Sequence, residues 1–204
     1  LQRTYVTTGA TVEPGESAPC ALPAATNWIE YRADRSGILH LAADGDTFDA
    51  FVAVYTWDTS GGFLPSPPGA KLQPVACAAE GTANAGLSFA ITRDTQYLIQ
   101  IGGRDGGSGN ISVTASCACA PPNDHFDNRD YLSIDAYQPE ATRGAGTTLA
   151  TLEPGEAQPC GNIDKTVWYT VYAYNAMSVA LDTSGSDFDT VIAVYRVPDD
   201  YSYN

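Results

Sequence analysis

The chain has 204 residues and a formal net charge of −14, with only 10 Lys and Arg against 24 Asp and Glu. A field of this sign repels nucleic acid and anionic lipid, so neither is an expected partner. Hydrophobic residues make up 44% and charged residues 17%, which indicates folded domains, yet no stretch approaches the ~18 apolar residues of a membrane helix. We therefore expect neither nucleic-acid binding nor membrane insertion.

Apolar and polar residues alternate with a period of two, which is typical of half-buried strands. In the first such segment Ile29, Tyr31 and Ala33 lie on one face, while Glu30 and Arg32 lie on the other. Turn formers such as DRSG, DGDT and GGRDGGSGN separate the segments, which favours an all-β sandwich or barrel. In chain order the other predicted strands cover residues 38–41, 51–56, 87–91, 97–101 and 111–115.

Residues 7–55 recur as residues 147–195 without a gap. The segment TTGATVEPGESAPC returns as TTLATLEPGEAQPC, and DGDTFDAFVAVY returns as SGSDFDTVIAVY. An internal repeat of this kind indicates one structural unit used twice. We therefore predict two β-sandwich units, residues 1–119 and 120–204, of which the second is incomplete at its C-terminal end.

The second unit has apolar residues at sandwich positions that its own predicted strands do not cover. These residues are Tyr169, Val171, Val179, Leu181 and Ile192. Apolar side chains facing water and open strand edges are costly and prone to aggregation. We therefore expect the second unit to be completed either by residues downstream of Asn204 or by self-association, through strand complementation or neighbouring repeats, with an extracellular polymer as one outcome of self-association.

The five cysteines occupy distinct places in this scheme. Cys20 and Cys160 are equivalent in the repeat, and Cys77 stands in LQPVAC, a segment without a counterpart in the second unit. We infer that Cys20 pairs with Cys77 and that Cys160 lacks its partner. Cys117 and Cys119 form Cys-Ala-Cys, whose spacing favours a structural bridge over a redox or metal pair. Disulfides predict an extracellular or cell-surface location, whereas a cytosolic location would require five free thiols.

Several segments together resemble the bacterial pre-peptidase C-terminal domain family. They are ATLEPGEAQPCG, VWYTVYA, SGSDFDTVIAVY, LQPVAC, SFAITRDTQYLIQIGG and GGSGNISV, and the resemblance covers nearly the whole chain. It implies tandem jelly-roll-like β-sandwich units, which occur beside secreted proteases and in arrays on bacterial surface proteins. Because such a domain serves many host proteins, its fold does not dictate an activity.

Two acidic clusters are candidate calcium sites. Asn123, Asp124 and Asp127 lie where the units meet, and some members of the resembled family hold calcium near their N-terminal segment. Asp46 and Asp49 are spaced like oxygen ligands, but the repeat replaces the first of them by serine. That replacement favours an Asp-capped turn. No cofactor is expected to be required, and Ca²⁺ is the one candidate ligand.

The Pro- and Gly-rich insertion WDTSGGFLPSPPGA is the best candidate for a binding surface. It carries Trp57, Phe63 and Leu64 between two predicted strands. Exposed aromatic residues on a sandwich rim often mark a partner surface. In the alternative, these side chains fold back over the sheet edge.

Catalysis has little support in the sequence. The only histidines are His40 and His125, and neither accompanies a nucleophile motif. We therefore predict that the chain is not an enzyme but a non-catalytic extracellular structural or adhesive repeat module of a bacterial surface protein or filament. The alternative is a substrate-targeting accessory domain of a secreted peptidase or other hydrolase.

Overall fold

The computed structural model describes residues 1–13, 16, 18–57, 72–79, 84–135, 137–172 and 176–196. It divides into two compact units, Leu1–Ala120 and Pro121–Asn204. Strands dominate the described residues, and the short 3₁₀ helix η2 covers Phe126–Asn128. None of the helical segments in this described part is long and apolar enough to cross a membrane.

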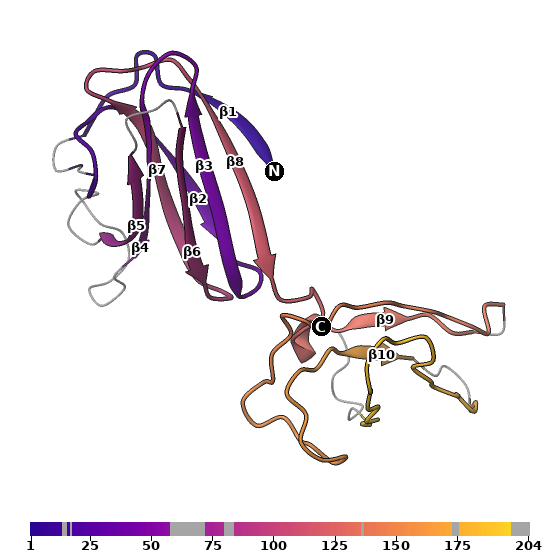
Figure 1. The fold of residues 1–204 in the computed structure, drawn as a ribbon. Coiled ribbons are helices and arrows are strands. Elements are labelled where there is room, and N and C mark those ends of the chain that lie inside the picture. Colours follow the sequence, from indigo (N-terminus) through magenta and orange to yellow (C-terminus); the bar gives the residue numbers. More distant parts are fainter. Residues whose placement is uncertain are drawn as a thin grey trace. The chain divides into compact units, whose positions relative to one another are not determined.

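The first unit is a β-sandwich of two four-stranded antiparallel sheets (Figure 1). One sheet has the order β1-β8-β3-β6 and the other has the order β2-β7-β4-β5. The strands are β1 (Gln2–Val6), β2 (Pro23–Arg32), β3 (Gly37–Gly45), β4 (Ala50–Trp57), β5 (Leu72–Ala79), β6 (Asn84–Ile91), β7 (Gln96–Arg104) and β8 (Asn110–Cys119). The predicted all-β sandwich is therefore confirmed for this unit.

Strand β4 explains why the segment AFVAVY lacks the usual alternation of apolar and polar residues. Val52 and Val54 are fully buried between the two sheets, where they join the main core. Phe51 and Tyr55, on the other face of β4, are also buried, in a second cluster that Leu98 helps to cover. Because both faces of the strand are covered, apolar residues are favoured at every position.

The six predicted strands of the first unit all coincide with observed ones, but β1 and β5 were not predicted. Strand β1 is mostly exposed and pairs only with β8, so its sequence carries little apolar alternation. Strand β5 contains Pro74, which argues against a central strand. It lies at the sheet edge, and its register with β4 shifts between Val54 and Tyr55, next to this proline.

The described residues of the second unit form a much smaller sheet. Strands β9 (Asp130–Leu132) and β10 (Tyr169–Val171) pair in parallel. Residues 177–185, which correspond to β3, form no strand in the structure. Leu181 is 43% exposed, whereas its counterpart Leu41 is 4% exposed. The repeated sequence therefore builds a sandwich in the first unit, whereas the described part of the second unit does not pair as one.

Candidate functional site

A partly buried polar cluster ties Glu16 of the first unit to one of its sheets. Glu16 Oε1 accepts hydrogen bonds from Gln100 Nε2 at 2.8 Å, from Trp28 Nε1 at 3.2 Å and from Thr26 Oγ1. The hydroxyl of Tyr55 donates to Gln100 Oε1 at 2.7 Å. Gln100 has no exposed surface, so its amide needs both partners. We call these five residues the Glu16 cluster.

The Tyr55 hydroxyl is held in its neutral, donating form. Burial, followed by the negative charge of Glu16, raises the pKa of Tyr55 to about 12. The other carboxylate oxygen, Glu16 Oε2, accepts from the backbone N–H of Glu13 at 2.8 Å. The cluster therefore holds Glu16 against the sheet.

The second unit rebuilds part of this cluster from the repeated residues. Glu156 Oε2 accepts from the backbone N–H of Glu153 at 3.1 Å and from Thr166 Oγ1 at 3.0 Å. The rings of Trp168 and Tyr195 lie 5.8 Å apart at an angle of 44°. We call Glu156, Thr166, Trp168 and Tyr195 the Glu156 cluster.

The aromatic pair of the first unit, Trp28 and Tyr55, has nearly the same geometry, with ring centroids 5.5 Å apart at 44°. The two clusters differ in their hydrogen bonds, however. The indole N–H of Trp168 is buried and has no hydrogen-bond partner among the described residues, whereas that of Trp28 is bonded to Glu16. The Tyr195 hydroxyl donates to the carbonyl of Ala157 at 2.9 Å. The described part of the second unit thus lacks a residue equivalent to Gln100.

The glycine-rich turn GGRDGGSGN packs around Phe48. A Cβ added to Gly103 would lie 3.0 Å from the Phe48 ring, and one added to Gly109 would lie 2.9 Å from it. Gly103 is also closed off by the backbone, since its Cβ would meet the carbonyl oxygen of Gly107 at 2.0 Å. The turn is therefore a strand connection, as the sequence favoured, with a packing role that the sequence did not reveal. In the second unit the counterpart of Phe48, Phe188, is 52% exposed.

The predicted disulfide between Cys20 and Cys77 is present, with the two Cα atoms 5.9 Å apart. It links the segment that carries Glu16 to strand β5. Cys117 and Cys119 form a second disulfide within β8. Cys160, the counterpart of Cys20, is a free and exposed thiol.

The acidic cluster at the start of the second unit is bonded to its own chain. Asp124 is buried, and its two carboxylate oxygens accept from the backbone N–H and the hydroxyl of Thr151, at 2.6 and 2.8 Å. Asn123 Nδ2 donates to the carbonyl of Trp168 at 3.1 Å. Asp127 is exposed on η2. Among the described residues, no group of three or more His, Cys, Asp or Glu is placed to hold a metal ion.

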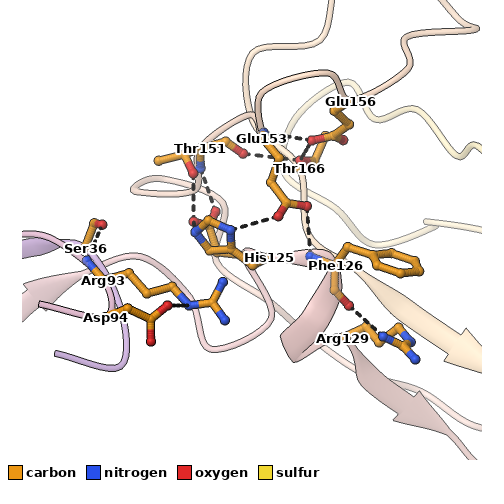
Figure 2. Close-up of polar contacts among 11 residues, drawn as sticks. Ser36, Arg93, Asp94, His125, Phe126, Arg129, Thr151, Glu153, Glu156 and Thr166 are labelled. Carbon is orange, nitrogen blue, oxygen red and sulfur yellow. Dashed lines mark hydrogen bonds and ion pairs between the residues drawn. The ribbon is translucent and has the colours of Figure 1, made fainter. Parts of the chain in front are cut away.

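The histidine of this region has a structural partner as well. His125 Nδ1 lies 2.9 Å from Glu153 Oε1, and Glu153 Oε2 accepts from the backbone N–H of Phe126 at 2.9 Å (Figure 2). These contacts join η2 to the turn that carries the second EPGE motif. No local sequence pattern predicts these contacts, since the residues are 28 positions apart.

The second candidate calcium pair lies at the end of β3. Asp46 Oδ2 accepts from Asn110 Nδ2 at 2.9 Å, and the backbone N–H of Asp46 donates to the carbonyl of Asn110 at 3.1 Å. The carbonyl of Asp49 accepts from the backbone N–H of Arg104 at 2.9 Å. Both residues therefore serve the turns that join the strands.

The candidate binding insertion is described only at its first residue. Trp57 ends β4, is partly buried and pairs with Leu72 of β5. Phe63 and Leu64 lie outside the described residues.

No family model matches the chain, and no curated protein matches it. Solved structures do resemble it. The pre-peptidase C-terminal domain of collagenase from Bacillus anthracis is 6% identical with a TM-score of 0.37, covering 57% of this chain and 88% of that one. The surface-associated copper-binding protein CorA of Methylomicrobium album BG8 is 7% identical with a TM-score of 0.40, covering 57% and 92%. The catalytic domain of a GH87 α-1,3-glucanase in complex with nigerose is 18% identical with a TM-score of 0.24, covering 66% and 29%.

Proposed function

We propose that this chain is a non-catalytic extracellular structural or adhesive repeat module of a bacterial surface protein or filament. The observation that carries the proposal is the recurrence of one cluster of Glu, Thr, Trp and Tyr in both units. The Trp–Tyr pair lies at the same angle of 44° in each, beside the same Glu and Thr. A unit that is duplicated along one chain is typical of repeat proteins, in which stacked or linked copies form an extended scaffold.

The strand order of the first unit supports its interpretation as a jelly-roll-like member of such an array. The sheets β1-β8-β3-β6 and β2-β7-β4-β5 have the eight strands in two sheets that characterise jelly rolls. The disulfide between Cys20 and Cys77 supports an oxidising, extracellular location, because such bonds are rare in the cytosol.

The polar side chains that could suggest catalysis have structural contacts. His40 Nδ1 lies 2.7 Å from Ser88 Oγ, but both side chains are on an exposed sheet face. A nucleophile and base of this kind need a third group that orients the base, and no carboxylate of the described residues contacts His40. The proposal therefore assigns the chain a binding or structural role.

The proposal is tested by locating the protein in the cells that produce it. Immunogold labelling of intact cells with antibodies against the first unit should decorate the surface or an extracellular fibre. Labelling confined to the cytosol would contradict the proposal.

A second measurement separates the structural role from the accessory one. Purified chain should leave a panel of peptide and glycan substrates unhydrolysed, and fusing it to a hydrolase should not increase hydrolysis of insoluble protein or polysaccharide. Faster hydrolysis of one such polymer by the fusion would instead favour a targeting domain of a secreted hydrolase.

A further inference from the structure

We propose that the side chains of Thr26 and Gln100 react with each other to form an ester, which joins strands β2 and β7 covalently and releases ammonia. The carboxylate of Glu16 is the general base of this reaction, and the hydroxyl of Tyr55 stabilises the negative charge that develops on the amide oxygen. The reaction is a single self-modification that consumes no outside substrate. The inference goes beyond the proposed function and does not rest on it.

The sheet places the two reacting side chains next to each other. In the antiparallel pairing of β2 with β7, Thr26 lies opposite Gly102 and Gln100 lies opposite Trp28. Thr26 and Gln100 are therefore diagonal neighbours on one face of the sheet, a separation that a long side chain such as glutamine can span. Because Gly102 has no side chain, no other side chain of β7 stands between them on this face.

Glu16 contacts both reacting groups through one oxygen atom. Its Oε1 accepts hydrogen bonds from Thr26 Oγ1 and from Gln100 Nε2, the latter at 2.8 Å. The hydroxyl and the amide nitrogen are therefore separated by no more than two hydrogen bonds. A hydroxyl is a weak nucleophile until an adjacent base accepts its proton, and a carboxylate is such a base. The same oxygen is placed to return that proton to the nitrogen.

The amide oxygen of Gln100 has a donor at the point where charge develops during acyl transfer. The Tyr55 hydroxyl donates to Gln100 Oε1 at 2.7 Å. A donor in this position polarises the carbonyl and stabilises the oxyanion of the tetrahedral intermediate. Burial, followed by the charge of Glu16, raises the pKa of Tyr55 to about 12, so the phenol keeps its proton at neutral pH.

The steps of the reaction balance in atoms and charge. The Thr26 hydroxyl passes its proton to Glu16, a bond forms from Oγ1 to Cδ of Gln100, and the carbonyl electron pair moves onto the amide oxygen. The proton then passes from Glu16 to Nε2, the bond from Cδ to Nε2 breaks, and the carbonyl is restored. The products are one ester and one ammonia molecule, and Glu16 regains its negative charge.

Burial favours this reaction over hydrolysis. Gln100 has no exposed surface, and Thr26 and Tyr55 are 6% and 4% exposed. The hydroxyl of Thr26, and not bulk water, is therefore the nucleophile beside the amide, and the same burial protects the ester once it has formed. Amides resist alcohols in free solution, but groups held in contact react as if at very high concentration. Ammonia takes up a proton in water and diffuses away, which opposes the reverse reaction.

The ester changes how the first unit resists force. The hydrogen bonds between β2 and β7 can open one after another from an end of the ladder, whereas a covalent bond keeps both strands in one register. Such a bond suits a module that carries load at a cell surface, although the chemistry does not depend on that location.

The mass of the 204-residue chain tests the proposal directly. After reduction of its disulfides, the purified chain should be lighter than its sequence by one ammonia molecule. Proteolysis and tandem mass spectrometry should find one branched peptide that contains both Thr26 and Gln100. Hydroxylamine, which attacks esters much faster than amides, should open this bond and leave a hydroxamate at position 100.

Two variants of Thr26 provide a matched comparison. Thr26→Val keeps the shape of the side chain and removes the nucleophile, so this chain should have its full sequence mass. Thr26→Ser brings back a hydroxyl and should restore the loss of ammonia. Gln96→Ala, on the same strand but outside the Glu16 cluster, should lose ammonia as the wild type does. The Cys20–Cys77 bond and the circular dichroism spectrum report whether each variant is folded.

Glu16→Gln and Tyr55→Phe test the two assisting groups. In chains made by cell-free synthesis under oxidising conditions and sampled over time, each variant should form the bond at least about a hundredfold more slowly than the wild type. Wild-type rates in both variants would overturn the roles assigned to these groups. The ester itself is refuted by a wild-type chain that keeps its full sequence mass after prolonged incubation, by a loss of ammonia that persists in Thr26→Val, or by a branched peptide that hydroxylamine leaves intact.

Discussion

Gln100 donates a hydrogen bond to Glu16 at 2.8 Å although 84 residues separate them along the chain. The bond fastens Glu16 to the central strand β7, and the Tyr55 hydroxyl donates to the oxygen of the same amide. Local sequence patterns carry no trace of such a contact. Its loss is nevertheless expected to lower the stability of the first unit.

Replacing Gln100 by Ala should lower the free energy of unfolding of the first unit by about 1–3 kcal/mol. The change removes both amide bonds and leaves the Tyr55 hydroxyl buried without its acceptor. Urea unfolding followed by tryptophan fluorescence measures the loss. Gln96→Ala is the control, because Gln96 is exposed on the same strand and should cost little. Equal effects of the two changes would show that the cluster does not stabilise the fold.

Stability should fall between about pH 10 and pH 12 because of Tyr55. Its pKa is raised to about 12 in the folded state, so the neutral phenol is favoured by folding. That contribution is fully present below the unfolded pKa of about 10 and is lost as the pH rises through the folded value. Tyr55→Phe should be less stable at neutral pH and should show a smaller fall over this range. An unchanged alkaline profile in the variant would assign the effect to other groups.

Gly103→Ala should destabilise the first unit by about 1–3 kcal/mol, as overpacking does. Its Cβ would meet the Gly107 carbonyl oxygen at 2.0 Å and the Phe48 ring at 3.0 Å, so the turn must open. The control is Gly86→Ala, whose Cβ would come no closer than 3.9 Å to its nearest neighbour. Thermal melts of the two variants should differ clearly, and a wild-type melt for Gly103→Ala would contradict the packing role of the turn.

Loss of the Cys20–Cys77 bond should lower the stability of the first unit by about 4 kcal/mol, the chain-entropy value for a separation of 57 residues. The double variant Cys20→Ser with Cys77→Ser should therefore melt well below the wild type. Cys160→Ser should not change this melt, because its thiol is free. The prediction fails if the double variant and the wild type melt together under oxidising conditions.

Asp124→Ala should expose the Thr151 amide to exchange, since both Thr151 donors lose their acceptor. Hydrogen exchange monitored by NMR reports this amide directly. Asp127→Ala, at an exposed position, is the matched control. We expect a chelator to leave the melting temperature of the wild type unchanged, because the buried carboxylate is already bonded to its own chain. A lower melting temperature in the chelator would instead favour a calcium site here.

Most of the first unit could be predicted from the sequence, because its central strands are short apolar segments bounded by turn-forming residues. Residues 97–101 are apolar at four of five positions, because Tyr97, Ile99 and Ile101 lie in the main core and Leu98 covers the second cluster. The disulfide between Cys20 and Cys77 followed from the repeat, in which only one copy has both cysteines. Strands β1 and β5 escaped prediction because edge strands bury little and tolerate residues such as Pro74.

The polar clusters could not be predicted, because their members are brought together only by the sheet. Trp28 and Trp168 are equivalent in the repeat, and each lies beside the equivalent tyrosine. The alignment did not show that an unaligned strand supplies the glutamine between them. The acidic residues at 123–127 looked like ligands because carboxylates are spaced alike in ligand loops and in turns that bond their own backbone.

The parallel pairing of β9 with β10 has a consequence for how the smaller sheet forms. Antiparallel strands can be joined by a two-residue turn, whereas parallel strands need a long connection between them. The segment between Leu132 and Tyr169 must therefore be brought into a closed loop before the two strands can meet. The pairing is a non-local contact, and its formation is expected to be slow compared with that of a hairpin.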